Sequence, residues 1–216
     1  MQLERDGAQR FPGAFPPCEV GALDGLFSEF TLSARLGATP GLGRLIGPAD
    51  ALARDLLGPA ARPVRALFFD KNSGHNWALG WHQDRTVAVR ARRDVPGFSA
   101  WTVKSGIHHV VPPFEYLERM LVLRIHLDAA GADNAPLLIA PGSHRLGPIT
   151  EPEIAAIVDR LGRASCLAQA GDVWAHAAPI LHASERAAAP ARRRVLQLGY
   201  SADDLPGGLE WLGASC

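Results

Sequence analysis

A short run with the composition of a metal site, Trp81-His82-Gln83-Asp84, lies near the middle of the chain. Residues two apart on a β-strand project to the same face, so His82 and Asp84 could offer an imidazole nitrogen and a carboxylate oxygen to one ion, while Gln83 points away. Because the chain has 8 histidines, such a triplet also arises by chance on a surface strand. The pair needs a third ligand before it indicates chemistry.

His182 is the candidate for that third ligand. It lies 100 residues further along (182 − 82), in the apolar run from Ile180 to Ser184, where an unpaired ring nitrogen would be costly to bury. Either a metal ion or an ordinary hydrogen bond would satisfy the ring. Two histidines and one carboxylate on one face of an octahedral ion form the facial triad of non-haem Fe(II) oxygenases, which leaves open positions for chemistry. We predict that His82, Asp84 and His182 are metal ligands and catalytic residues.

Short strands must position these ligands, because apolar runs separated by turn residues follow Pro63. We expect strands at Val64–Phe69, Trp81–Val89, Met120–Leu127, Pro136–Ile139, Val173–Ala175, Ile180–Ser184 and Val195–Tyr200. Strands of this length and spacing predict a sandwich or barrel that is mainly β. One helix should interrupt them after Thr150, which forms a capping box with Glu153.

The N-terminal part has the periodicity of helices. Leu23, Leu26, Phe27 and Phe30 have the spacing of one buried helix face, and a second helix is expected over Ala49–Leu57, before Gly58-Pro59. We therefore predict a single domain over residues 1–216, in which residues 1–62 form a mostly helical part packed on the barrel.

Charge and cysteine usage narrow the function classes. Lys+Arg and Asp+Glu number 22 each, and the absence of a basic surplus argues against nucleic acid as a partner. No apolar run reaches the roughly 20 residues of a membrane helix, and Met1 to Arg10 do not resemble a secretory signal. The 3 cysteines are widely spaced, which argues against a disulfide framework. We expect a cytoplasmic protein with a small-molecule substrate; the sequence does not indicate its oligomeric state.

Several further motifs occur in a characteristic order. They are Lys71 ahead of the Trp-His-Gln-Asp run, Asn134-Ala135-Pro136-Leu137 leading to Pro141-Gly142-Ser143-His144, Gly171-Asp172-Val173, Leu181-His182-Ala183-Ser184, and the run Arg192 to Arg194. From about Phe68 to the C-terminus, the sequence resembles the phytanoyl-CoA dioxygenase-like (PhyH) branch of the Fe(II)/2-oxoglutarate oxygenases. The resemblance implies a double-stranded β-helix (a cupin-like jelly roll) with peripheral helices and a metal in its mouth. It also implies use of O2 and hydroxylation of a small molecule, with release of succinate and CO2.

The same resemblance implies a binding site for 2-oxoglutarate. In the family this co-substrate chelates iron through its 1-carboxylate and keto oxygen, and its distal carboxylate pairs with an arginine eleven residues after the second histidine, here Arg193 (182 + 11). Ser184 would support the same carboxylate, and a guanidinium fork suits it physically. Lys71 falls where the family has a lysine near the 1-carboxylate; its alternative role is a solvated strand end.

The sequence departs from the family pattern in the connector before the arginines. Ala187 stands where the family often has asparagine, and residues 187–191 are alanine-rich. The register could therefore shift by one residue, which would give the co-substrate to Arg192 or Arg194. Ala135 replaces a commoner glycine, and we expect little effect.

Candidates for substrate contacts are fewer. Trp77 and Trp81 flank the metal strand and could line the substrate entrance, and residues 99–113 are a candidate lid. Polar residues from Arg124 to Asp128 alternate with apolar ones, and the sequence does not show which set faces the barrel interior. An outward salt-bridged row is the default expectation, whereas an inward Arg124 would be a substrate or cofactor clamp. We expect His176 to be satisfied within the core.

Two other functions compete with a hydroxylating oxygenase. A halogenase on the same scaffold replaces the carboxylate ligand with a small residue, and the presence of Asp84 argues against it. A non-redox or catalytically silent cupin-like protein would bind a metal or a small acid without oxygen chemistry, and turnover of 2-oxoglutarate would distinguish the two.

Overall fold

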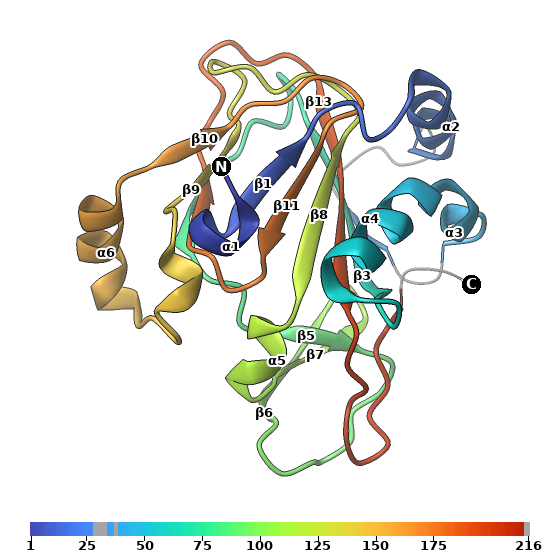
Figure 1. Ribbon diagram of the computed structural model, residues 1–216, viewed down its shortest axis with the longest axis vertical. Coiled ribbons are helices and arrows are strands. Elements are labelled where there is room, and N and C mark those ends of the chain that lie inside the picture. Colours follow the sequence, from blue (N-terminus) through green and yellow to red (C-terminus); the bar gives the residue numbers. More distant parts are fainter. Residues whose placement is uncertain (28–33, 37–38, 214–216) are drawn as a thin grey trace.

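Two antiparallel sheets face each other in the computed structural model, which describes residues 1–27, 34–36 and 39–213 (Figure 1). The larger sheet contains, in spatial order, β1 (Ala8–Phe11), β11 (Val173–Ala177), β8 (Leu121–His126), β13 (Arg193–Ser201), β3 (Arg62–Lys71) and β2 (Ala34–Leu36). The smaller contains β10 (Ala164–Cys166), β9 (Leu137–Ile139), β12 (His182–Ser184) and β4 (Leu79–His82). This confirms the mainly β, double-stranded β-helix architecture.

A third sheet lies at one end of the molecule, at the bottom of Figure 1. It contains β5 (Val87–Val89), β7 (Ile107–Val111) and β6 (Ser99–Lys104). The candidate lid, residues 99–113, is therefore mostly a hairpin of this sheet. The apolar side of this sheet packs against the large sheet and α5 (Phe114–Glu118) through Val87, Val110, Leu117 and Val122. Strand β6, at the edge, is mostly exposed.

Helices cover the outside of both sheets. They are α1 (Leu3–Asp6), α2 (Pro17–Phe27), α3 (Leu42–Leu45), α4 (Gly47–Leu57), α5 (Phe114–Glu118) and α6 (Ile154–Leu161), with 3-10 turns η1 (Ser143–Arg145) and η2 (Glu151–Glu153). In Figure 1, α2, α3 and α4 lie on one side of the large sheet and α6 lies beside the small one. The peripheral helices inferred from the sequence are thus confirmed.

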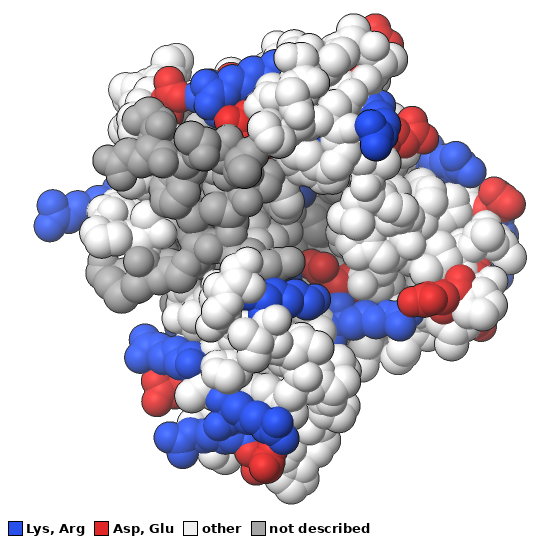
Figure 2. All heavy atoms as spheres, turned by 180° about the vertical axis from the view of Figure 1, so that it is seen from behind, with Lys and Arg blue, Asp and Glu red and all other residues white. Residues whose placement is uncertain are grey.

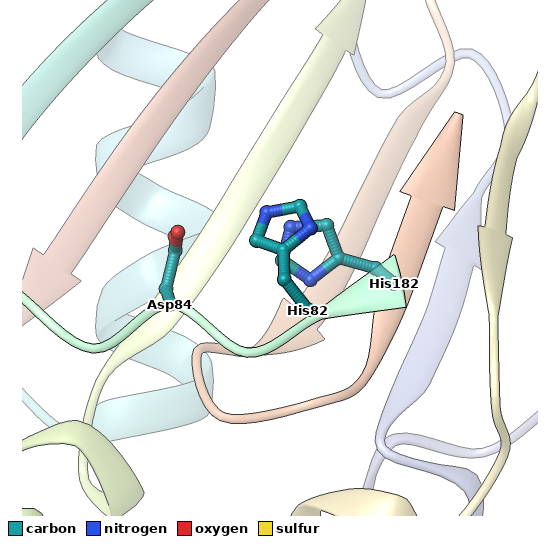
Figure 3. Close-up of side chains that lie close together, drawn as sticks. All are labelled: His82, Asp84 and His182. Atoms are coloured by element: carbon teal, nitrogen blue, oxygen red, sulfur yellow. The ribbon is translucent and has the colours of Figure 1, made fainter. Parts of the chain in front are cut away.

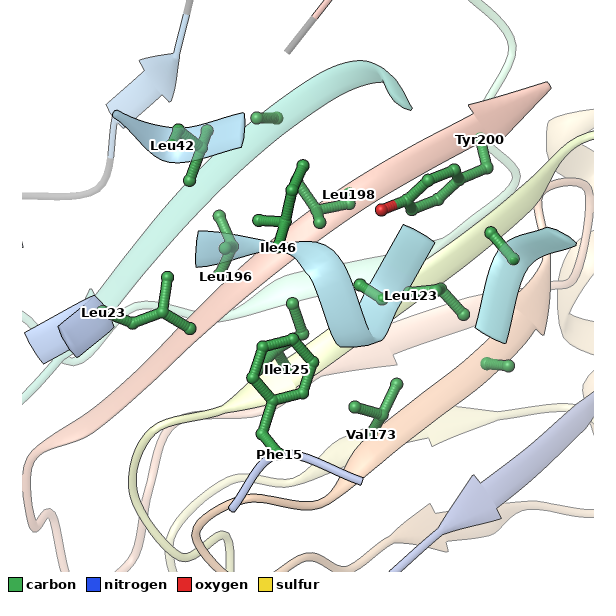
Figure 4. Close-up of a cluster of buried hydrophobic side chains, with 14 of the residues drawn as sticks. Phe15, Leu23, Leu42, Ile46, Leu123, Ile125, Val173, Leu196, Leu198 and Tyr200 are labelled. Atoms are coloured by element: carbon green, nitrogen blue, oxygen red, sulfur yellow. The ribbon is translucent and has the colours of Figure 1, made fainter. Parts of the chain in front are cut away.

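The main hydrophobic core lies between the large sheet and the helices α2 to α4 (Figure 4). Alternate strand residues point into it, among them Leu123 and Ile125 of β8 and Leu196 of β13. Helix residues meet them from the other side, including Leu23 of α2 and Ile46 ahead of α4. We call this helix-covered face the outer face of the large sheet, and the face toward the small sheet its inner face.

The N-terminal part contains strands as well as the expected helices. Helix α2 buries Leu23 and Phe27 as predicted, while Phe30 lies outside the described residues. The helix predicted over Ala49–Leu57 is confirmed as α4. The strands β1 and β2 were not predicted, and they add to opposite edges of the large sheet. The N-terminal part therefore completes the sheet as well as covering it.

The capping box before α6 is confirmed. The Glu153 carboxylate accepts hydrogen bonds from the Thr150 amide (2.9 Å) and hydroxyl (2.6 Å). Behind it, Ile154 and Val158 are buried against Leu181. Helix α6 thus supports the strand that carries His182.

The molecular surface mixes charges of both signs. Seen from behind, basic side chains gather on the lower part of the molecule with acidic ones beside them (Figure 2). Exposed ion pairs such as Arg90–Glu210 (3.2 Å) and Arg92–Asp94 (3.3 Å) have this character. Within the described ranges, no helix has the length and hydropathy needed to cross a membrane.

Candidate metal and co-substrate site

The three residues predicted to bind metal converge in the structure. His82 ends β4, His182 begins β12, and the two are direct partners across these antiparallel strands. Asp84 follows two residues after His82, and one possible ligand atom from each side chain lies within 4.8 Å of the others. Figure 3 shows the two rings close together, with the Asp84 carboxylate beside them.

Backbone carbonyls fix both histidine rings. Nδ1 of His82 lies 2.8 Å from the Gly80 oxygen, and Nδ1 of His182 lies 2.9 Å from the Ile180 oxygen. A carbonyl can only accept, so Nδ1 is the protonated nitrogen and Nε2 keeps its lone pair for a ligand bond. Burial lowers the pKa of His182 to about 4, which keeps this ring neutral near pH 7. The donor set of two imidazoles and one carboxylate therefore fits a divalent metal.

Asp84 reaches the site from outside a strand, which corrects the expectation of one strand over Trp81–Val89. Strand β4 ends at His82. The side chain of the next residue, Gln83, points away from the candidate ligands and is held by hydrogen bonds. Its amide donates to the Pro179 oxygen (2.8 Å), and its side-chain oxygen accepts from the Ile149 amide (2.8 Å). This anchoring still leaves His82 and Asp84 facing the same space.

A basic residue that the sequence did not single out lies beside Asp84. Nη1 of Arg65 lies 3.6 Å from the Asp84 carboxylate, too long for a good hydrogen bond. Burial raises the pKa of Asp84, but Arg65, followed by the nearby histidines, more than offsets this and lowers it below its usual value. A small cavity of about 20 Å³ adjoins the pair, lined also by Leu117, Met120 and Gln197.

The strand that carries His182 is held by the Pro-Gly-Ser-His motif. The buried Ser143 hydroxyl accepts a hydrogen bond from the Leu181 amide at 2.8 Å. The Ala140 amide donates to the Leu181 oxygen at 3.0 Å. The motif thus fixes the backbone immediately before the ligand.

The three arginines of the run point to different faces of the sheet. Arg192 pairs with Asp70 (2.9 Å) and Arg194 with Asp128 (2.8 Å), both away from the inner face. Arg193 points inward and is 3% exposed. Its Nε and Nη1 atoms have no hydrogen-bond partner among the described residues, and burial lowers its pKa to about 10.

Hydrogen bonds from outside hold the alanine-rich connector in place. The Asn76 side-chain oxygen accepts a hydrogen bond from the Ala187 amide (2.8 Å), and the Asn76 side-chain nitrogen donates one to the Ala187 backbone oxygen (3.0 Å). Further on, the Ala191 amide donates to the Asn134 side chain (3.2 Å), which gives the Asn-Ala-Pro-Leu motif a structural task. Ala135 in that motif has φ 50°, a left-handed conformation that favours glycine, so this replacement is less neutral than expected.

Lys71 is buried on the inner face, which excludes the alternative of a solvated strand end. Its ammonium donates to the Glu185 backbone oxygen (2.6 Å) and the Ser184 hydroxyl (3.2 Å). The residue pairs across strands with Arg193, and Nζ lies 5.2 Å from the centre of the Trp77 ring. Lys71, Ser184, Arg193 and Trp77 therefore form one group.

Arg124 also points inward, so the default expectation of an outward salt-bridged row is wrong. It is 6% exposed and donates to the Gln197 side chain, while its Nε has no partner in the described structure. The next inward residue, His126, is 1% exposed, and neither of its ring nitrogens has a hydrogen-bond partner among the described residues. The polar alternation along β8 was the available signal; it could not tell the two faces apart.

His176 lies in the core as expected, whereas Trp81 does not lie where a substrate residue was expected. The His176 ring centre lies 5.6 Å from that of His182, and Nδ1 lies 3.0 Å from the Ala177 oxygen. It is therefore satisfied by the backbone, and its ring borders the candidate metal ligand His182. Trp81 packs on the α6 side with Ile154 and Val158, so the structure does not bring this predicted substrate residue to the triad.

Comparisons with known proteins agree with this geometry. Residues 45–195 match the family model described as phytanoyl-CoA dioxygenase (PhyH). No curated protein sequence matches the chain.

Among solved structures, HygX from Streptomyces hygroscopicus, crystallised with nickel and 2-oxoglutarate, is similar with TM-score 0.62 and 16% identity, covering 92% of this chain and 84% of HygX. EctD from S. alaskensis, crystallised with 2-oxoglutarate and 5-hydroxyectoine, has TM-score 0.69 and 19% identity, covering 92% and 73%. The epimerase SnoN has TM-score 0.62 and 19% identity, covering 95% and 87%. These structures share the fold, and on the family match this chain belongs to the phytanoyl-CoA dioxygenase family.

Proposed function

We propose that this protein is an Fe(II)- and 2-oxoglutarate-dependent dioxygenase that hydroxylates a small molecule. The observation that carries the proposal is the convergence of His82, Asp84 and His182 within 4.8 Å. Family membership supports it, as do the structures of HygX with nickel and 2-oxoglutarate and of EctD with 2-oxoglutarate.

In the proposed site, His82, Asp84 and His182 would hold Fe(II), which supplies the redox chemistry with dioxygen. The carbonyls of Gly80 and Ile180 orient the two imidazoles, so that each presents Nε2. Three protein ligands leave room for other groups on an octahedral ion.

Arg193 would bind the distal carboxylate of 2-oxoglutarate. Its buried N–H groups without partners are the donors that a carboxylate satisfies, and a buried guanidinium is strongly stabilised by such an anion. Ser184 would contribute its hydroxyl, and Lys71 a positive charge. Arg192 and Arg194 are excluded from this role because carboxylates of the protein already bind them.

The proposed reaction consumes one O2, one 2-oxoglutarate and one C–H bond of the substrate. One oxygen atom enters succinate as CO2 leaves, and the other forms the hydroxyl group. The alternative, a catalytically silent cupin-like protein, predicts metal binding without succinate formation. Because SnoN is an epimerase, product analysis must accompany the succinate measurement.

The test has a binding arm and a turnover arm. Anaerobic protein with Fe(II) and 2-oxoglutarate should show the weak visible band of a metal-bound keto acid, and Asp84→Ala and His182→Ala should each abolish it. Aerobic screening of small molecules should then find substrates that stimulate succinate release. A normal band in the double variant would overturn the metal assignment, and binding without any succinate would favour the silent alternative.

A further inference from the structure

Three cations on the inner face of the large sheet have no carboxylate partner among the described residues. Lys71 donates to the Ser184 hydroxyl and the Glu185 backbone oxygen, and Arg124 donates to the neutral Gln197 side chain. Two N–H groups of Arg193 have no partner in the described part of the chain. No ion pair to any of the three occurs within the described parts of the chain. Buried charges of one sign are unfavourable without a counter-ion, so the group is suited to a dianion.

The strand register places these cations at two levels. Lys71 lies directly opposite Arg193, whereas Arg124 lies opposite Gln197, four residues further along β13. Four residues of strand span about 13 Å. Arg124 is offset toward Val122, the partner of His176, whose ring borders His182. Along the strands, the Arg124 backbone therefore lies between the Lys71–Arg193 pair and His176, which is next to His182.

We propose that Arg124, rather than Lys71, faces the metal-bound keto-acid end of 2-oxoglutarate. Lys71 then joins Arg193 and Ser184 around the distal carboxylate. This assignment rests on the proposed function and reverses the role that the family resemblance gives to Lys71.

The local contacts fit both roles. Nζ of Lys71 already lies 3.2 Å from the Ser184 hydroxyl, so one carboxylate can meet the ammonium, the hydroxyl and the opposing guanidinium. Gln197 and the Phe69 ring hold the Arg124 guanidinium; the ring centre lies 5.5 Å away. One Arg124 nitrogen, Nε, remains without a partner in the described structure.

Two keto acids separate the two ends of the site. 2-Oxopentanoate has the same five carbons and the same keto-acid end as 2-oxoglutarate but lacks the distal carboxylate. We would titrate each acid into the full-length protein loaded with Ni(II) by calorimetry, and measure weak binding by displacement of 2-oxoglutarate. Arg124→Met and Lys71→Met keep most of the side-chain length and remove the charge, and Arg192→Met serves as a control on the other sheet face.

Arg124→Met should weaken the binding of both acids by a similar factor, roughly 10- to 100-fold for a lost hydrogen bond to a charged group. Lys71→Met should weaken 2-oxoglutarate by roughly that factor and change 2-oxopentanoate by less than about threefold. If Lys71→Met weakens both acids while Arg124→Met weakens neither, or if both variants lose only 2-oxoglutarate, the assignment is overturned.

Two checks keep these outcomes interpretable. Arg124→Lys replaces Arg124→Met if thermal melting shows that the latter does not fold, and it should retain part of the affinity for both acids. Failure of the nickel-loaded wild-type protein to bind 2-oxoglutarate would overturn the proposed function itself. Wild-type binding with the reversed variant pattern would overturn only the roles of Arg124 and Lys71.

Discussion

The two faces of the large sheet use the same strands for opposite purposes. On β8, Leu123 and Ile125 point to the outer face and are packed by helices, whereas Arg124 and His126 point to the inner face. All four residues are at most 6% exposed. The outer face gains stability from apolar burial. The inner face buries polar groups that have no partner among the described residues, which is unfavourable unless a ligand satisfies them. Binding capacity and stability are thus divided between alternate residues.

The largest expected difference concerns unfolding. Leu123→Ala should lower the free energy of unfolding by roughly 2–5 kcal/mol, the usual range for removing a buried leucine. Leu123 is fully buried in the main core. Chemical denaturation without metal or 2-oxoglutarate measures the effect. A loss below about 1 kcal/mol would show that the outer face is not the main source of stability.

The next prediction concerns binding on the inner face. Arg193→Met should weaken the binding of 2-oxoglutarate by about 2–5 kcal/mol, because the distal carboxylate loses a buried charged partner. Metal affinity should remain near wild type. Calorimetry on Ni(II)-loaded protein measures both. Arg192→Met is the matched control, since Arg192 binds Asp70 on the other side, and a larger loss there than in Arg193→Met would refute the assigned register.

A third prediction concerns acid stability. Burial, followed by the charges of Arg124 and Arg193, lowers the pKa of His126 to about 3, with Asp172 opposing and Arg10 adding. The unfolded chain binds a proton near pH 6.5, so the contribution of His126 to stability is present above that pH and is lost as pH falls toward 3. The loss approaches about 1.4 kcal/mol per pH unit.

The variant His126→Leu should therefore lose roughly 2 kcal/mol less stability than wild type between pH 7.5 and pH 5. Denaturant titrations at the two pH values, on protein without metal or 2-oxoglutarate, measure the difference. Equal losses in both proteins would show that the pKa of His126 is not lowered in the folded state.

The smallest expected effect is at the neighbour of Leu123. Arg124→Met should change the free energy of unfolding by no more than about 1 kcal/mol without ligands, because losing the bond to Gln197 is offset by no longer burying a charge. The same denaturation experiment compares it directly with Leu123→Ala. A loss as large as that of Leu123→Ala would mean that Arg124 is structural and would weaken the division between the faces.

The sequence by itself determined the composition of the candidate metal site. The His82-x-Asp84 spacing, the isolated His182 and the arginine run could be recognised because ligand type and local spacing are properties of the chain. The helix α4 and the capping box at Thr150 were also predictable, since local periodicity and hydrogen bonding specify them. The irregular segment that turns Asp84 toward His82 and His182 was not predictable, because residues distant in the sequence hold Gln83.

Only the tertiary structure decided which polar residues face the site. Alternation along β8 showed that its two faces differ, but an alternating strand ordinarily has one face in water. Here helices cover one face and the small sheet covers the other, so the polar face is also buried. Likewise, the position of Lys71 beside Arg193 depends on the pairing of β3 with β13, strands more than 100 residues apart. Such pairing is fixed by packing of the whole sheet, which local spacing does not encode.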